Sequence, residues 1–126
     1  MTSAIDRHLE KARRGISIVR PEAAAELHAA GALLVDTRPA AQRAEFGQIP
    51  GAVVIERNVL EWRLDPTSEH RHPAAIGHNG PIVVFCQEGY SSSLAVASLT
   101  ALGINEVHDL AGGFAAWAAA GLPVET

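Results

Sequence analysis

Short apolar runs alternate along this chain with longer segments in which apolar and polar residues are mixed. The apolar runs have the length of strands and predict five of them, at residues 16–19, 32–36, 52–55, 81–85 and 106–110. The mixed segments predict helices, at residues 3–14, 21–31, 39–46, 58–64, 92–102 and 114–120. Strands that alternate with helices are typical of parallel βαβ units. We therefore expect an α/β fold, with a central and mainly parallel sheet flanked by helices on both faces.

Proline and glycine mark the boundaries of these elements. Pro21 suits the first turn of a helix, Gly103 closes the helix that starts at residue 92, and Gly112-Gly113 interrupts the chain before the last helix. A chain of 126 residues is the size of one domain and can bury a single core. We predict an N-terminal helical extension over residues 1–15 and one domain over residues 16–126.

Cys86, the only cysteine in the sequence, stands between a predicted strand and a predicted helix. In open α/β sheets, sites lie at the carboxyl ends of the strands, and this edge would also hold Asp36 and Ile55. The loop from Cys86 to Ser91 leads into the positive end of a helix dipole and can turn its N–H groups inward, where they would favour a thiolate. The pattern therefore predicts a sulfur nucleophile inside an anion-binding loop. A small buried core cysteine, with Ser91 or Ser92 as a helix cap, is the alternative.

Composition excludes several classes of function. The net charge of −4 and a pI near 5.8 argue against nucleic acid as a main partner. No apolar stretch approaches the ~20 residues of a membrane helix, so we expect no membrane partner. One cysteine allows no internal disulfide, and the first residues form no apolar signal segment, so we expect a reducing cytoplasmic setting.

The chain resembles the rhodanese family, the single-domain sulfurtransferases, over roughly residues 16–124. The motifs that carry the resemblance are Val35-Asp36-Thr37-Arg38 with Glu45-Phe46, residues 47–52, residues 82–85 with the six-residue loop from Cys86 to Ser91, residues 109–117, and Gly121-Leu122-Pro123. Each motif alone is weak evidence, but their joint occurrence in this order is strong. The resemblance implies a rhodanese-like α/β domain.

The resemblance also implies an activity. Cys86 would take a sulfane sulfur from a small-molecule donor, become a persulfide, and pass the sulfur to cyanide, a small thiol or a protein acceptor. The backbone amides of the anion loop, with Ser91 next to the sulfur, would cradle the charge; its residues are Gln87, Glu88, Gly89, Tyr90, Ser91 and Ser92. Asp36 and Arg38 would support this loop. The chemistry needs no organic cofactor and no metal.

Two positions depart from the family pattern. Gln48 stands where many members have histidine, and the loop carries Gln87 and Glu88 with no lysine or arginine. Members that use thiosulfate efficiently often have basic residues in this loop, so we expect a persulfide, mercaptan or protein donor to suit Glu88 better. Arg57 would compensate if it faces the pocket. A surface position for Arg57 is the alternative.

Other classes of function fit the sequence less well. Phosphatases of this fold have a Cys-x5-Arg loop, and the arginine position falls here at Ser92. The segment around Ser91, residues 89–93, lacks the second glycine of the Gly-x-Ser-x-Gly elbow of serine hydrolases. A metal site at His70, His72 and His78 has no second ligand cluster to support it. A non-catalytic domain that binds a partner or senses redox state remains the main alternative, and the presence of Cys86 argues against it.

Overall fold

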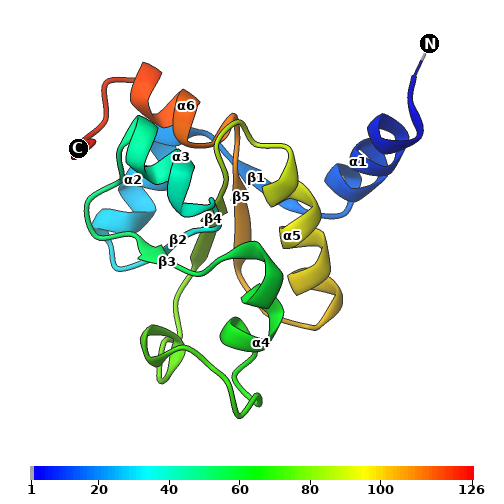
Figure 1. Ribbon diagram of the computed structural model, residues 1–126. Coiled ribbons are helices and arrows are strands. Elements are labelled where there is room, and N and C mark those ends of the chain that lie inside the picture. The colour runs from blue at the N-terminus through cyan, green and yellow to red at the C-terminus, as the bar shows by residue number, and fades with distance from the viewer. Residues whose placement is uncertain (1) are drawn as a thin grey trace.

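The computed structural model describes residues 2–126, which form a five-stranded parallel sheet between two layers of helices (Figure 1). The strands are β1 (Ser17–Val19), β2 (Leu33–Asp36), β3 (Val53–Val54), β4 (Ile82–Phe85) and β5 (Val107–Leu110). Their order across the sheet is β1-β5-β4-β2-β3, and every neighbouring pair is parallel. The predicted α/β class is therefore confirmed.

Helices cover both faces of this sheet. The α-helices are α1 (Ala4–Arg14), α2 (Pro21–Ala29), α3 (Ala40–Phe46), α4 (Leu60–Leu64), α5 (Ser91–Ala101) and α6 (Gly113–Ala119). Two 3₁₀ turns, η1 (Arg57–Val59) and η2 (Pro73–Ala75), accompany them. Figure 1 shows α4 and α5 on one side of the sheet and α2, α3 and α6 on the other.

The alternation of side chains along the strands divides the core into two layers. Val35 and Val84 point to the face covered by α4 and α5, where they pack with Leu60, Leu64, Ala95, Val96 and Leu99. Leu34 and Phe85, their neighbours in sequence, point to the other face and pack with Ala24, Phe114 and Trp117. Because both faces are buried, β2 and β4 read as unbroken apolar runs.

Local contacts shorten or shift some predicted elements. β3 contains two residues instead of the predicted 52–55, because this edge strand pairs only with β2, through Val53 and Val54. The predicted helix over 58–64 is divided into η1 and α4. The predicted loop over 66–80 contains η2, whose first turn is capped by the His72 ring accepting the Ala74 N–H. Tyr90 is the N-cap of α5, so the suggestion that Ser91 or Ser92 caps this helix is wrong.

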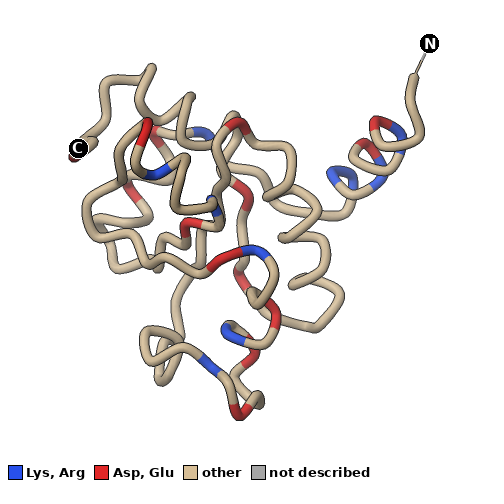
Figure 2. Tube along the Cα trace, in the orientation of Figure 1, with Lys and Arg blue, Asp and Glu red and all other residues tan. Residues whose placement is uncertain are grey.

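Helix α1 lies against α5, outside the two core layers (Figure 1). Ser3 and Asp6 form a capping box at its start, and Leu9 is its one buried residue. Acidic and basic residues are interleaved along it (Figure 2), as expected for a solvated helix. Within residues 2–126, no helix is long and apolar enough to cross a membrane. The division into an extension over 1–15 and a domain over 16–126 stays a prediction.

Candidate active site

Cys86 follows the carboxyl end of β4 and is buried at the bottom of the loop that leads into α5. Two backbone N–H groups donate toward its sulfur: that of Gly89 at 3.2 Å and that of Ser92 at 3.4 Å. The Ser92 hydroxyl oxygen lies 3.3 Å from Sγ. Because these amides stand at the N-terminus of α5, both local hydrogen bonds and the helix dipole favour negative charge on the sulfur.

The glycine pair at the start of α6, Gly112 as its N-cap and Gly113 as its first residue, lies against this loop. The first free N–H groups of α6 donate to the loop, Phe114 to the Cys86 carbonyl and Ala115 to the Gln87 carbonyl, both at 2.9 Å. Gly113 has φ +62°, and a Cβ there would lie 2.5 Å from the Cys86 carbonyl oxygen. Only glycine allows so close an approach at this backbone conformation. The Gly112-Gly113 motif is therefore part of the site's architecture.

A fully buried ion pair fixes the other side of the loop. The Arg38 guanidinium donates to the Asp36 carboxylate, with 2.8 Å between Nη2 and Oδ2, and neither side chain is more than 1% exposed. Arg38 also donates to the Gly47 carbonyl at 2.8 Å and to the Gln87 side-chain oxygen at 2.9 Å. Its guanidinium stacks 4.2 Å above the Phe114 ring centroid. Arg38 thereby ties the end of β2 to the cysteine loop and to α6.

A chain of polar side chains continues from Cys86 into the interior. The Ser92 hydroxyl donates to Asp109 Oδ1 at 2.6 Å, and Ser93 Oγ lies 2.5 Å from Asp109 Oδ2. Arg13 of α1 reaches the far end and donates to Ser93 Oγ at 3.1 Å. Burial raises the pKa of Asp109 above its ordinary value, while hydrogen bonds from Ser92 and Ser93 and the charge of Arg13 act in the opposite direction.

A cavity of about 410 Å³ opens above Cys86. Its lining residues are Thr37, Arg38, Pro39, Gln42, Arg57, Cys86, Gln87, Glu88, Tyr90 and Ser91. Arg57 donates to Glu61 at 2.8 Å, and the other Glu61 oxygen accepts the Ser98 hydroxyl. Burial alone would raise the pKa of Glu61, but the hydrogen bonds from Ser98 and Arg57 outweigh it and hold that pKa below its ordinary value.

The structure brings most of the predicted site residues around this cavity. Arg57 lines it, as one of the two sequence-based interpretations expected. Ser91 lies at the exposed rim, and Ser92 takes the place next to the sulfur that was expected for Ser91. Asp36 lies beneath the cavity as the partner of Arg38.

Sequence reasoning missed Arg13, Ser93 and Asp109. A carboxylate inside the predicted strand over 106–110 was the available signal for Asp109, since charged side chains are rarely buried without a partner. No local signal marks Arg13, because its partners lie 76 and 80 positions away along the chain.

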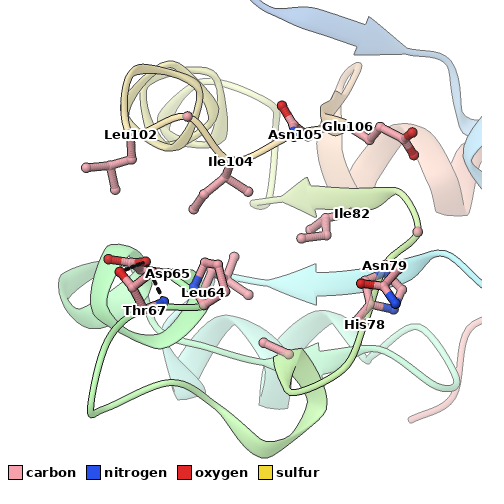
Figure 3. Close-up of a pocket in the computed structure, with 14 residues that line it drawn as sticks. Leu64, Asp65, Thr67, His78, Asn79, Ile82, Leu102, Ile104, Asn105 and Glu106 are labelled. Atoms are coloured by element: carbon pink, nitrogen blue, oxygen red, sulfur yellow. Dashed lines mark hydrogen bonds between the residues drawn. The ribbon is translucent and has the colours of Figure 1, made fainter.

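A second and larger cavity, of about 530 Å³, lies at the opposite ends of β4 and β5 (Figure 3). Leu64, Ile82 and Ile104 point into it, and Asp65 and Thr67 are hydrogen-bonded to each other at its rim. Cys86 is not among its lining residues. Of the three loop histidines considered as metal ligands, only His78 lines this cavity. Over residues 2–126, no three His, Cys, Asp or Glu side chains gather in a group that could hold a metal ion.

Comparison with known solved structures finds the same fold in other proteins. A protein of unknown function from Rhodopseudomonas palustris, described as a possible tyrosine phosphatase, matches 99% of this chain and 96% of its own with a TM-score of 0.87 and 31% identity. That alignment includes the region of α1. The thiosulfate sulfurtransferase of Pseudomonas aeruginosa matches 87% of this chain and 19% of its own, with a TM-score of 0.70 and 30% identity.

Comparison of sequences gives the family. The chain is 35% identical over 108 residues to the thiosulfate sulfurtransferase GlpE of Ectopseudomonas mendocina, covering 86% of this chain and 89% of that protein. It is 34% identical to a sulfurtransferase of Allochromatium vinosum over 73% of this chain and 77% of that protein. The family model of the Rhodanese-like domain matches residues 20–120. The chain therefore belongs to the family of rhodanese-like domains.

Proposed function

We propose that this protein is a sulfurtransferase that carries a sulfane sulfur on Cys86 as a persulfide. The observation that supports this most directly is the position of Sγ, which receives two backbone N–H groups and opens into a cavity large enough for a small donor. The names of the relatives, thiosulfate sulfurtransferase and sulfurtransferase, point to the same activity.

The first half-reaction is a displacement at sulfur. The Cys86 thiolate attacks the sulfane sulfur of the donor and forms an S–S bond, while the donor's own bond to that sulfur breaks and the leaving group takes the electron pair. With thiosulfate, the leaving group is sulfite and the product is the Cys86 persulfide anion. The N–H groups of Gly89 and Ser92 stabilise the negative charge on the attacking sulfur.

The second half-reaction restores the enzyme. A cyanide or thiolate acceptor attacks the outer sulfur and leaves as thiocyanate or as a new persulfide, and the electron pair of the broken S–S bond returns to Cys86. Two displacements separated by release of the first product predict ping-pong kinetics. Among the charged side chains that line the cavity, Arg57 is placed to meet an anionic donor and Glu88 opposes one.

The experiment is intact mass spectrometry before and after treatment with thiosulfate or with a small persulfide, followed by addition of cyanide. Because the chain has one cysteine, a gain of one sulfur atom that cyanide removes assigns the persulfide to Cys86. Cys86→Ser should gain no sulfur and show no transfer, while its unfolding curve stays close to that of the wild type. Near-wild-type transfer by this variant would overturn the proposal.

The same protein sample can be used to test the two alternative functions, a non-catalytic domain and a phosphatase. A partner-binding or redox-sensing domain would take up no sulfur from either donor. A phosphatase would hydrolyse p-nitrophenyl phosphate, which we expect this protein not to do, since Ser92 stands where those enzymes have the phosphate-binding arginine. This expectation concerns the chain itself, whatever is true of its R. palustris relative.

A further inference from the structure

Arg13 connects the N-terminal helix to the cysteine loop from outside the matched family domain. Its guanidinium donates to the Gly89 carbonyl at 2.9 Å and to Ser93 Oγ at 3.1 Å. It also lies 5.7 Å from the centroid of the Tyr90 ring, above the exposed end of the loop. Neighbouring Arg14, in contrast, is exposed and pairs with Glu10 on its own helix. One arginine of this helix therefore faces the site, while the next faces solvent.

The protons in this network have a fixed count. Ser93 holds one hydroxyl proton and has two acceptors, Asp109 Oδ2 and the Gly89 carbonyl. Arg13 donates to both Ser93 Oγ and the Gly89 carbonyl, and the nearer acceptor of the Ser93 proton is Asp109 Oδ2, at 2.5 Å against 3.0 Å for the Gly89 oxygen. Ser92 also holds one proton, which it donates to Asp109 Oδ1, while its oxygen accepts the Cys86 thiol. When Cys86 becomes a thiolate, Asp109 and the sulfur compete for this one proton. When an ionised Asp109 already accepts the Ser93 hydroxyl, it competes less strongly with the Cys86 sulfur for the Ser92 proton.

Charge acts in the same direction. A Cys86 thiolate and an ionised Asp109 would be two buried anions joined by one serine hydroxyl. The other charged or titratable groups that line the cavity next to Cys86 are Arg38, Arg57, Glu88 and Tyr90. Arg38 is bound to Asp36 and Arg57 to Glu61, so each already faces a carboxylate. Arg13 is the cation that faces Asp109, across Ser93.

We propose that Arg13 is a positioning residue for Cys86: it orients the Ser93 hydroxyl toward Asp109, balances the Asp109 charge, and so leaves the Ser92 hydroxyl free to donate to the thiolate. The inference rests on the proposed function only in taking Cys86 as the reactive group. It makes the N-terminal helix part of the active site.

The test is the pH dependence of Cys86 alkylation by iodoacetamide, which requires no sulfur donor. In Arg13→Met, which keeps the length of the side chain and removes its charge, the pH midpoint should rise by about one unit, equivalent to roughly tenfold less thiolate below the midpoint. Arg14→Met is the matched control on the same helix and should leave the midpoint unchanged. An unchanged midpoint in Arg13→Met overturns the proposal.

The Asp109→Asn background separates positioning from general loosening of the loop. Without the Asp109 charge, adding Arg13→Met should move the midpoint by less than ~0.3 unit, because the two changes act through one network. An equal rise in both backgrounds would mean that Arg13 does not act through Asp109. Arg13→Lys keeps the charge, so its alkylation midpoint should rise less than that of Arg13→Met. This variant also serves as the test if Arg13→Met folds poorly. Equal rises in the two variants would refute the charge argument. If the wild type takes up no sulfur, the proposed function fails, but the midpoints still test Arg13.

Discussion

The buried pair of Asp36 and Arg38 should be among the most sensitive positions for stability in this protein. In Arg38→Met, the Asp36 carboxylate loses a partner that donates to both of its oxygens, and it stays in a place with no access to water. Removal of one member of a buried ion pair costs about 3–5 kcal/mol. The Gly47 carbonyl also loses its donor from Arg38, which adds about 1 kcal/mol.

A loss of roughly 4–6 kcal/mol is a large part of the 5–15 kcal/mol that stabilises a typical domain. For a chain of 126 residues, a loss of about 4 kcal/mol corresponds to a melting temperature roughly 15 °C lower. The loss should be measured from urea unfolding curves followed by circular dichroism and by tryptophan fluorescence, since Trp117 is buried in the same core cluster as Phe114, on which Arg38 stacks. The matched control is Arg20→Met, whose pair with Glu22 is solvent-exposed and should contribute less than about 1 kcal/mol.

The double variant Asp36→Asn, Arg38→Met distinguishes the cost of an unpaired buried carboxylate from the cost of lost packing around Arg38. It leaves no buried carboxylate at this place, so it should recover at least half of the stability that Arg38→Met loses, although it carries one more substitution. If the double variant is no more stable than the single one, or if Arg38→Met loses less than about 1 kcal/mol, the reasoning from the buried charge is wrong.

Three further predictions concern charges around Cys86. Glu88→Lys should raise kcat/KM for thiosulfate roughly tenfold and for a neutral persulfide far less, with a gain that shrinks in salt; equal effects on both donors would mean that Glu88 faces away from the substrate. Glu61→Gln keeps a hydrogen-bond acceptor for Arg57 but removes the negative charge that balances it. In steady-state assays, kcat/KM for thiosulfate should therefore rise several-fold. An unchanged value would mean that Arg57 does not contribute to binding of the donor. Because the pKa of Asp109 is raised, its stabilising contribution is complete below the ordinary value of 3.8 and is lost as the pH rises through the raised value. Urea unfolding should therefore show the stability of the wild type relative to Asp109→Asn falling as the pH rises from 4, and a constant or rising difference would contradict the sign.

The strands and helices that pack in the core could be predicted from the sequence because their signals are local. Residues 82–85 form an unbroken apolar run, and both faces of that strand are buried. Pro21 opens α2, and Gly103 follows α5, as the turn chemistry predicts. The prediction failed for β3, where the apolar run over 52–55 is longer than the pairing that an edge strand makes with β2. The length of such a strand depends on its neighbour, which the run itself does not encode.

The position of Cys86 could be predicted, but the partner of its sulfur depends on where α5 begins. The helix starts at Ser91, and successive side chains are turned by about 100° around a helix axis. Ser91 therefore points to the exposed rim while Ser92 points inward to Sγ and Asp109. A shift of one residue in the predicted start of a helix exchanges these two serines, and sequence patterns rarely fix a boundary that closely. The role of Arg13 could not be predicted for a different reason: only the packing of α1 on α5 brings this residue to the loop.

The cations near Cys86 come from elements around the loop and not from the loop itself. Arg38 belongs to the chain after β2, Arg57 to η1 and Arg13 to α1, and each faces a carboxylate: Asp36, Glu61 and, across Ser93, Asp109. Their charges are thus largely balanced before any substrate arrives, and within residues 2–126 Glu88 makes no ion pair. Backbone N–H groups and the start of α5 are then the main source of attraction for negative charge on the sulfur. Such a site should stabilise the single charge of a thiolate or persulfide at Cys86 better than the double charge of a thiosulfate in the cavity. We therefore predict that a donor with less charge than thiosulfate will fit this loop better.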